Sequence, residues 1–383
     1  MDTMLNHERE LNRARVRSLT LVTLMLGSVL ISFVPAVSAS HVETYHTQRN
    51  PSSIASGDLN CDNDPDIVTG SEMGMFLTVL INNGGDFSER SDIWVSNNAS
   101  RRAAWADMAD ASQVAIGDID DDGANDIVYF QQNVWVAGAS APPMGNVTII
   151  WGDCNSDVST WSQSTPITVS PFIIGMEVED VNDDGKLDIV TLAIDETQTN
   201  MELMVMRGPN PTQQTSQSVT NIPLTTSYYY SMALGHWGET VQGSGFPGQG
   251  DCEDLDIWMM SSPPYNGPQT GFSAGNFDNV TVLEYNCLTN VYENPATSQT
   301  GVHVFQMQSN DCPCFGFDVA DTDGDNIVDM VAGIEGWEQN ITYATRSSVG
   351  GSWTTGNKAH IGNYVGADAI SGFEEVKPMV FAG

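Results

Sequence analysis

The sequence has few basic residues, no helical hydrophobic pattern beyond its first 40 residues, and only one long apolar run. Lys and Arg number 13 against 49 Asp and Glu in 383 residues, which gives a formal net charge of −36. Nucleic acids and anionic membrane surfaces are bound through basic patches, so this balance argues against both as partners. The chain is nevertheless 40% hydrophobic, which is enough for a large core. We therefore expect a folded, acidic protein with no nucleic-acid partner.

The one long apolar run lies near the N-terminus and has the features of a secretory signal. Four arginines precede a mostly apolar stretch at 19–37, and Val37-Ser38-Ala39 offers the small residues that a signal peptidase reads. We predict a signal peptide over 1–39, a linker over 40–52 and one folded domain over 53–383. The alternative is an uncleaved anchor, because the stretch approaches the ~20 residues that span a bilayer. Either way the protein is predicted to be secreted or on the cell surface, and it is attached to a membrane only if the leader stays uncleaved.

The six cysteines are compatible with disulfides in an exported protein. Their spacing does not choose among the pairings. Cys312 and Cys314 stand close together, but no second cysteine pair or histidine cluster accompanies them. We expect bridges to other strands there in preference to a metal or redox site.

Four acidic nine-residue segments align without gaps, at 58–66, 118–126, 180–188 and 321–329. Each runs directly into apolar residues such as Ile67-Val68, and apolar residues with glycine precede it. A third stretch rich in β-branched residues follows, for example at 76–81, and then come turn-forming residues. The pattern predicts units of about four antiparallel strands, with the acidic segment as the loop between the first two.

The last aspartate of the loop recurs at nearly regular intervals. It stands at positions 66, 126 and 188, in a degraded copy at 256, and at 329, so the intervals are 60, 62, 68 and 73 residues. A two-sheet sandwich needs no loop repeated at one point of each unit, and the repeats of a β-helix are much shorter. The predicted fold class is therefore all-β: a β-propeller of four-stranded blades with metal-binding loops.

Positions 1, 3 and 5 of each loop are Asp or Asn, and position 9 is Asp. Such crowded hard oxygen donors suit the 6–8 coordination of Ca²⁺. Position 6 is always Asn or Gly, which tolerate a left-handed backbone, and position 7 varies freely, as expected of a carbonyl ligand. An EF-hand would need a glutamate at position 12 and flanking helices, and position 12 is never glutamate here. The dockerin-type calcium loop shares the same opening residues and is rejected as an alternative on similar grounds.

These loops resemble the FG-GAP or VCBS repeat of integrin-type β-propellers, whose hallmark is D-x-[DN]-x-[DN]-G-x-x-D between the first two strands of a blade. Phe315-Gly316 resembles the FG element, and 80–87 is similar to the stretch after the second strand in VCBS repeats. The resemblance covers about 53–383 and implies a seven-bladed ring. The chain supplies about six blades, the sixth incomplete, so we expect a fragment; an unusual ring is the alternative.

The resemblance also implies about four structural Ca²⁺ ions, bound at positions 1, 3, 5 and 9 of each loop, to which the carbonyl of position 7 is added. The predicted metal residues are Asp58, Asn60, Asp62, Asp64 and Asp66; Asp118, Asp120, Asp122, Ala124 and Asp126; Asp180, Asn182, Asp184, Lys186 and Asp188; and Asp321, Asp323, Asp325, Ile327 and Asp329.

The fourth unit departs from the pattern, because positions 1, 3 and 5 counted back from Asp256 are two glycines and a cysteine. Calcium is not expected there. A Gly-rich insertion at 239–250 lies beside His236 and Trp237. Ligand sites in repeat proteins concentrate in such insertions, so this region is the predicted binding site for an extracellular protein or glycan.

The sequence contains no HExxH, P-loop or dinucleotide motif, and its histidines are scattered. The first functional hypothesis is therefore a secreted or cell-surface calcium-binding propeller that serves as a non-catalytic binding or adhesion module and is not an enzyme. The second is the propeller portion of an extracellular polysaccharide-degrading enzyme whose catalytic part lies outside this chain, since propellers of this kind occur in lyases and hydrolases.

Overall fold

The computed structural model describes part of the chain, and the statements below refer to these residues. They are 45–47, 51–71, 76–95, 110–132, 144–155, 157–223, 228–236, 255–262, 279–286, 291–292, 302–306, 316–321, 327–333, 340–345, 354–355 and 359–360.

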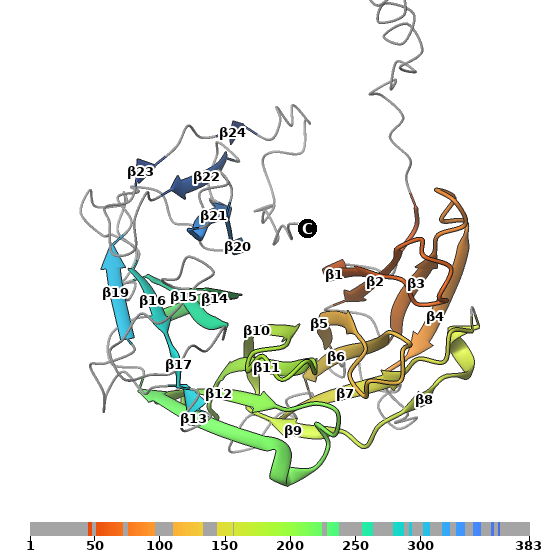
Figure 1. Ribbon diagram of the computed structural model, residues 1–383, viewed down its shortest axis with the longest axis horizontal. Coiled ribbons are helices and arrows are strands. Elements are labelled where there is room, and N and C mark those ends of the chain that lie inside the picture. Colours follow the sequence, from red (N-terminus) through yellow and green to blue (C-terminus); the bar gives the residue numbers. More distant parts are fainter. Residues whose placement is uncertain are drawn as a thin grey trace, which may run out of the picture. The chain divides into compact units, whose positions relative to one another are not determined.

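The described residues form an all-β protein of antiparallel sheets, as predicted, and we number the sheets 1 to 5 in chain order (Figure 1). Sheet 1 contains β1 (Pro51–Gly57), β2 (Asp66–Ser71), β3 (Phe76–Ile81) and β4 (Glu89–Trp94). Sheet 2 contains β5 (Asp110–Gly117), β6 (Asp126–Gln132), β7 (Gly145–Trp151), β8 (Ser162–Gln163) and β9 (Ile167–Val169). The single pair Ser71 and Ala111 joins sheets 1 and 2.

Sheet 3 contains β10 (Phe172–Glu179), β11 (Asp188–Ile194), β12 (Asn200–Met206) and β13 (Gln217–Pro223). Sheet 4 contains β14 (Tyr228–Gly235), β15 (Asp256–Ser262), β16 (Asn279–Leu283) and β19 (Val302–Gln306). Between β16 and β19 in the sequence, β17 (Tyr285–Asn286) and β18 (Val291–Tyr292) form a separate hairpin. Sheet 5 contains β20 (Gly316–Ala320), β21 (Asp329–Gly333), β22 (Asn340–Thr345), β23 (Thr354–Thr355) and β24 (Ala359–His360). Two short 3₁₀ helices, η2 (Val158–Thr160) and η3 (Gln214–Ser216), are the only helices described, and neither could cross a membrane.

The same strand register recurs in all five sheets. The residue before each first-to-second strand connection pairs with the aspartate that ends it, for example Gly57 with Asp66 and Gly117 with Asp126. Sheet 4 keeps this register in the pair Gly235 and Asp256, although its connection is longer and lacks the alternating acidic residues of the other loops. In sheets 1 to 4 a register shift, typical of a β-bulge, also interrupts each first strand near its start. The repeat read from the sequence is therefore a repeat of structure.

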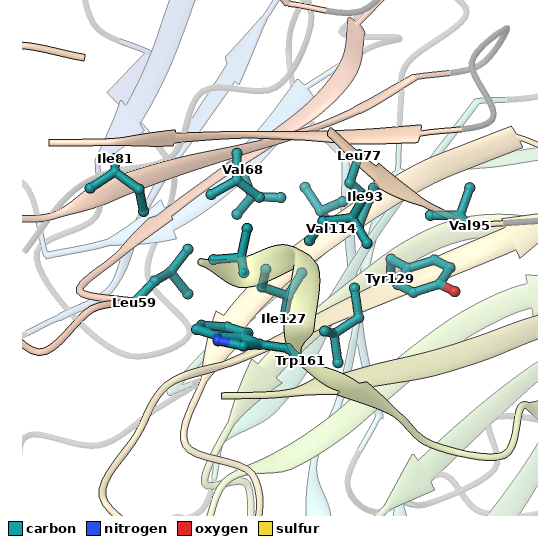
Figure 2. Close-up of a cluster of buried hydrophobic side chains, with 13 residues drawn as sticks. Leu59, Val68, Leu77, Ile81, Ile93, Val95, Val114, Ile127, Tyr129 and Trp161 are labelled. Atoms are coloured by element: carbon teal, nitrogen blue, oxygen red, sulfur yellow. The ribbon is translucent and has the colours of Figure 1, made fainter. Parts of the chain in front are cut away.

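The inner strands of the sheets bury side chains on both faces. In β6, Ile127 and Tyr129 belong to the apolar cluster shared with sheet 1, which Figure 2 shows, whereas Val128 and Phe130 belong to a cluster shared with sheet 3. A third cluster joins strands of sheets 3 and 4, such as β11 and β15. Because successive side chains of a strand point to opposite faces, burial of both sets means that the sheets pack face to face in chain order.

The first strands of successive sheets approach one another closely, at positions where glycine allows it. A Cβ on Gly57 would lie 2.6 Å from Ile116 of β5, and one on Gly117 would lie 2.9 Å from Val178 of β10. A Cβ on Gly235 of β14 would lie 2.5 Å from Val319 of β20. These separations are shorter than packed carbon atoms tolerate. Glycine therefore lets β1, β5, β10, β14 and β20 pack in succession.

A disulfide joins Cys61 in the first acidic loop to Cys154 after β7, across 93 residues of sequence. The expectation that cysteines of this chain bridge separate segments is confirmed for this pair. Cys312 and Cys314 lie outside the described residues.

Candidate metal-binding loops

The loops of sheets 1, 2 and 3 share one backbone shape; we call them loop 1 (58–66), loop 2 (118–126) and loop 3 (180–188). Position 6 is left-handed in all three, with φ of 70° at Asn63, 93° at Gly123 and 79° at Gly185, as predicted. Position 4 is left-handed as well, and it is occupied by Cys61, Asp121 and Asp183. The two left-handed residues turn the chain twice within the loop, which brings together the side chains at its odd-numbered positions.

The carboxylates at positions 1 and 5 hold this shape through backbone hydrogen bonds. In loop 2, Asp118 accepts hydrogen bonds from the N–H groups of Asp122 at 3.0 Å and Gly123 at 2.9 Å. Asp122 accepts one from the N–H of Ala124 at 2.9 Å. Loops 1 and 3 repeat all three bonds at the equivalent positions. The predicted residues at positions 1 and 5 are therefore gathered within each loop.

The aspartate at position 9 is fully buried, and in loops 1 and 2 its carboxylate accepts hydrogen bonds from two separate segments of the sheet. We call this arrangement the clamp. One oxygen of Asp126 accepts the N–H of Ile119 at position 2 of its loop, at 2.9 Å, and the other accepts the N–H of Gly152 after the third strand, at 2.7 Å. Asp66 makes the same two bonds, to Leu59 and Asn82, both at 2.8 Å. The carboxylate thus connects the acidic loop to the end of the third strand.

Two carboxylate oxygens in these loops are buried and have no hydrogen-bond partner in the structure: Oδ1 of Asp120 and Oδ2 of Asp188. In Asp188 only Oδ1 is bonded, to the N–H of Gly208 at 3.0 Å. In loop 2, one oxygen each of Asp118, Asp120 and Asp126 lies within 4.8 Å of the other two. Oxygens that each lie 2.3–2.6 Å from a Ca²⁺ ion fall within such a spread.

The carboxylates of the loops are buried and close to one another, and a bound cation would reduce the cost of their negative charge. Burial raises the pKa of Asp126 to about 7 despite its two backbone hydrogen bonds, with further contributions from Asp120 and Asp122. Burial likewise raises the pKa of Asp188 to about 7. The pKa of Asp120 is raised by burial and then by its two acidic loop neighbours. A hard cation would compensate this crowded negative charge.

Neighbouring loops touch one another. The side-chain amide of Asn125, at position 8 of loop 2, donates a hydrogen bond of 2.8 Å to the carbonyl oxygen of Asp58 at position 1 of loop 1. Lys186, at position 7 of loop 3, forms an ion pair with Asp121 at position 4 of loop 2. The three loops therefore form a continuous acidic row.

The other predicted site residues are described only in part. In the loop at 321–329, Ile327 and Asp329 are buried and Asp321 is exposed, whereas Asp323 and Asp325 lie outside the described residues. Of the predicted ligand site, His236 is described and exposed, but Trp237 and the insertion at 239–250 are not among the described residues. The predicted contact region thus stays a prediction.

Sequence reasoning missed the clamp role of position 9. Asp256 in sheet 4, which no acidic loop precedes, still accepts a hydrogen bond from the N–H of Tyr285 at 3.2 Å. This bond follows the third strand, as the bonds of Asn82, Gly152 and Gly208 do in the other sheets. The presence of Asp256 in a unit without the acidic loop could have indicated this role in the sequence, because a residue that serves only metal binding is not needed there.

A second group of acids lies on the first strands. Burial raises the pKa of Glu177 on β10 to about 8, and the charges of Asp318 on β20 and Glu179 add to the effect. Since this value lies above that of an unfolded glutamate, Glu177 costs no stability below pH ~4.5 and destabilises the fold increasingly up to pH 8.

We expect Glu177→Gln to raise the free energy of unfolding by about 2 kcal/mol at pH 8, a value reduced for the partial exposure of the side chain, and to change it little at pH 4.5. Urea unfolding of both proteins at the two pH values, in the same calcium concentration, measures this. An equal difference at both pH values would contradict the assignment.

No protein-family model matches the chain, and it matches no curated protein. Several solved structures show a distant likeness. One is an exo-β-1,3-galactanase from Phanerochaete chrysosporium with galactose, with 9% identity and a TM-score of 0.38 over 82% of this chain. Another is described as a GH43 β-1,3-galactosidase, with 11% identity and a TM-score of 0.33 over 76% of this chain. The chain spans 61% and 54% of the lengths of those two chains.

The FG-GAP or VCBS resemblance stays a prediction, since no family model matches the chain, and only the all-β fold that it implied is shown. One other prediction is corrected. The hypothesis of a non-catalytic binding or adhesion module that is not an enzyme is contradicted, since both solved structures are glycosidases. The physical reason for the error is that glycosidases use carboxylates from distant parts of the chain, so the lack of a short catalytic motif excluded nothing. At these TM-scores no catalytic residue or substrate is carried over.

Proposed function

We propose that this chain is a calcium-binding β-propeller that forms part of an extracellular polysaccharide-degrading enzyme. The observation that carries the calcium assignment is the buried, unpartnered Oδ2 of Asp188. A buried carboxylate oxygen without a donor is costly, and a cation bound in the loop would remove that cost. The unpartnered Oδ1 of Asp120 in loop 2 supports the same assignment independently.

The donor set fits calcium better than other common metals. Positions 1, 3, 5 and 9 offer only carboxylate and amide oxygens, and position 7 offers a carbonyl, so that Asp180, Asn182, Asp184, Lys186 and Asp188 would hold one ion in loop 3. No histidine or thiolate in the described loops would favour zinc; the sulfur of Cys61 is bonded to Cys154. The bound ion would supply charge compensation and would fix the loop shape.

The propeller part of the proposal is supported by the packing of the sheets. Sheets that bury both faces and whose first strands meet in chain order are what consecutive blades require. The repeated strand register and the bulge in the first strand give the same indication. The acidic loops would then be the connections between the first two strands of each blade.

Counting bound ions tests the calcium assignment. The protein is dialysed against buffer with about 1 mM calcium, because extracellular calcium modules have dissociation constants of about 0.1–1 mM. Elemental analysis, corrected for the calcium of the buffer, should find about one ion for each of loops 1, 2 and 3. Asp184→Ala should lose about one ion, because position 5 of loop 3 supplies a ligand. Asp92→Ala, on exposed β4, removes the same charge away from the loops and should lose none. A protein without bound calcium would refute the assignment.

Sugar release tests the enzymatic part. We expect the protein to release reducing ends from a polysaccharide in a panel that includes β-1,3-galactan, the type of substrate named for one of the solved structures. Both the 383-residue chain and the product of its complete gene should be assayed, because the catalytic carboxylates need not lie in the described sheets. Absence of release from every polysaccharide by both proteins would refute this part and leave the calcium assignment intact.

A further inference from the structure

We propose that loops 1, 2 and 3 bind calcium cooperatively, because side chains join each loop to the next at positions that flank the ligands. This inference rests on the proposed calcium binding and adds its regulation. The joints are the Lys186–Asp121 ion pair between loops 3 and 2 and the Asn125–Asp58 hydrogen bond between loops 2 and 1.

The ion pair connects the parts of two loops that calcium would order. Asp121 stands between Asp120 and Asp122, at the left-handed position 4 of loop 2. Lys186 stands at position 7 of loop 3, whose carbonyl is a candidate ligand, and its N–H is already bonded to Asp184. An ion in loop 2 would fix Asp121 and thereby hold Lys186 in place. The ordering cost of filling loop 3 would then be lower, which is positive cooperativity.

A hydrogen bond joins loop 1 to loop 2, and a disulfide joins loop 1 to the residues after β7. Asn125 donates its side-chain hydrogen bond to the backbone of Asp58, whose carboxylate is the first ligand of loop 1. Asn125 is also adjacent to Asp126, the last ligand of loop 2. The disulfide from Cys61, between Asn60 and Asp62, ties the same loop to the residues after β7. Reorganisation of either loop therefore acts on the other.

Loop 3 also approaches loop 2 through the backbone. A Cβ on Gly208, which donates to Asp188, would lie 3.2 Å from the carbonyl oxygen of Ile119 in loop 2. Ile119 in turn donates its N–H to Asp126. The backbone segments that donate to Asp188 and to Asp126 thus lie close together, and both carboxylates are candidate ligands.

Asp183 provides a matched control for Asp121. It occupies the same position 4 in loop 3, is left-handed and exposed, and has no ion-pair partner among the described residues. Asp121→Asn and Asp183→Asn each remove one negative charge, and asparagine tolerates the left-handed backbone well. The two variants therefore differ chiefly in the contact to the next loop.

The experiment is a calcium titration in competition with a chromophoric chelator, with loop 3 intact or weakened by Asp184→Asn. In the wild-type background we expect Asp184→Asn to weaken the remaining sites by about three- to five-fold, the size of an exposed ion pair's contribution. In the Asp121→Asn background the same change should leave the remaining sites unchanged. The Asp183→Asn background should behave as the wild type does.

The outcomes separate the inference from the proposed function. If Asp184→Asn affects the remaining sites equally with and without Asp121→Asn, or not at all, the coupling through this pair is refuted while calcium binding stands. If the wild-type protein binds no calcium, both are refuted. Circular dichroism first establishes that each variant is folded, and Asn182→Ala replaces Asp184→Asn if the latter does not fold.

Discussion

Replacing Asp126 with alanine should lower the free energy of unfolding by about 2–4 kcal/mol in chelator, and by more in calcium, because a candidate ligand of loop 2 is then lost as well. The change leaves the buried N–H groups of Ile119 and Gly152 without an acceptor, and each unpaired group costs about 1–3 kcal/mol. Removing a carboxylate whose pKa is raised to about 7 by burial offsets part of this loss. Urea unfolding with and without calcium measures the effect.

Two variants separate the clamp from the metal ligand. Asp122→Ala, at the exposed position 5 of the same loop, should destabilise the protein chiefly when calcium is present. Asp256→Ala, in the sheet without an acidic loop, should cost about 1–2 kcal/mol equally with and without calcium, since its bond to the N–H of Tyr285 is lost and no calcium is expected there. If Asp126→Ala has no effect in chelator, position 9 acts only through the ion.

Removing calcium should lower the melting temperature by on the order of 10 °C. Calcium at 100 times the dissociation constant of a site stabilises a fold by about 2.7 kcal/mol, so three loops filled to that level would contribute roughly 8 kcal/mol. Calorimetry in 1 mM calcium and in excess chelator measures the difference. A return of calcium should restore the melting temperature, and magnesium, which demands stricter octahedral geometry, should restore less of it. An unchanged melting temperature would contradict the calcium assignment.

Local features of this protein could be predicted from its sequence, and long-range ones could not. The loops and their flanking strands follow from short patterns, namely alternating oxygen donors, a glycine or asparagine at position 6 and β-branched residues after position 9. The clamp escaped prediction because Asp126 and Gly152 are 26 residues apart and meet only through the strand register. The contacts between loops span 65 and 67 residues, and the disulfide spans 93.

The functional error has a similar origin. The absence of a short catalytic motif excludes only enzyme classes whose catalytic residues lie in such a motif. Carboxylates that act on a glycosidic bond need only a defined separation in space, and neighbours in space can be far apart in the sequence. Glu177 on β10 and Asp318 on β20 illustrate this, since their charges interact across 141 residues, the difference between their residue numbers.

Because of the clamp, the connection between the first two strands can differ between sheets while the strand register stays the same. Because Gly235 and Asp256 pair as Gly57 and Asp66 do, the sheet closes in the same register whether residues 58–65 or residues 236–255 lie between its strands. Mutations in this connection can therefore lengthen it, delete its ladder or introduce a new surface without altering the strands on either side. For protein engineering, this connection is a natural place to graft a foreign loop onto the scaffold, and sheet 4 is the natural precedent.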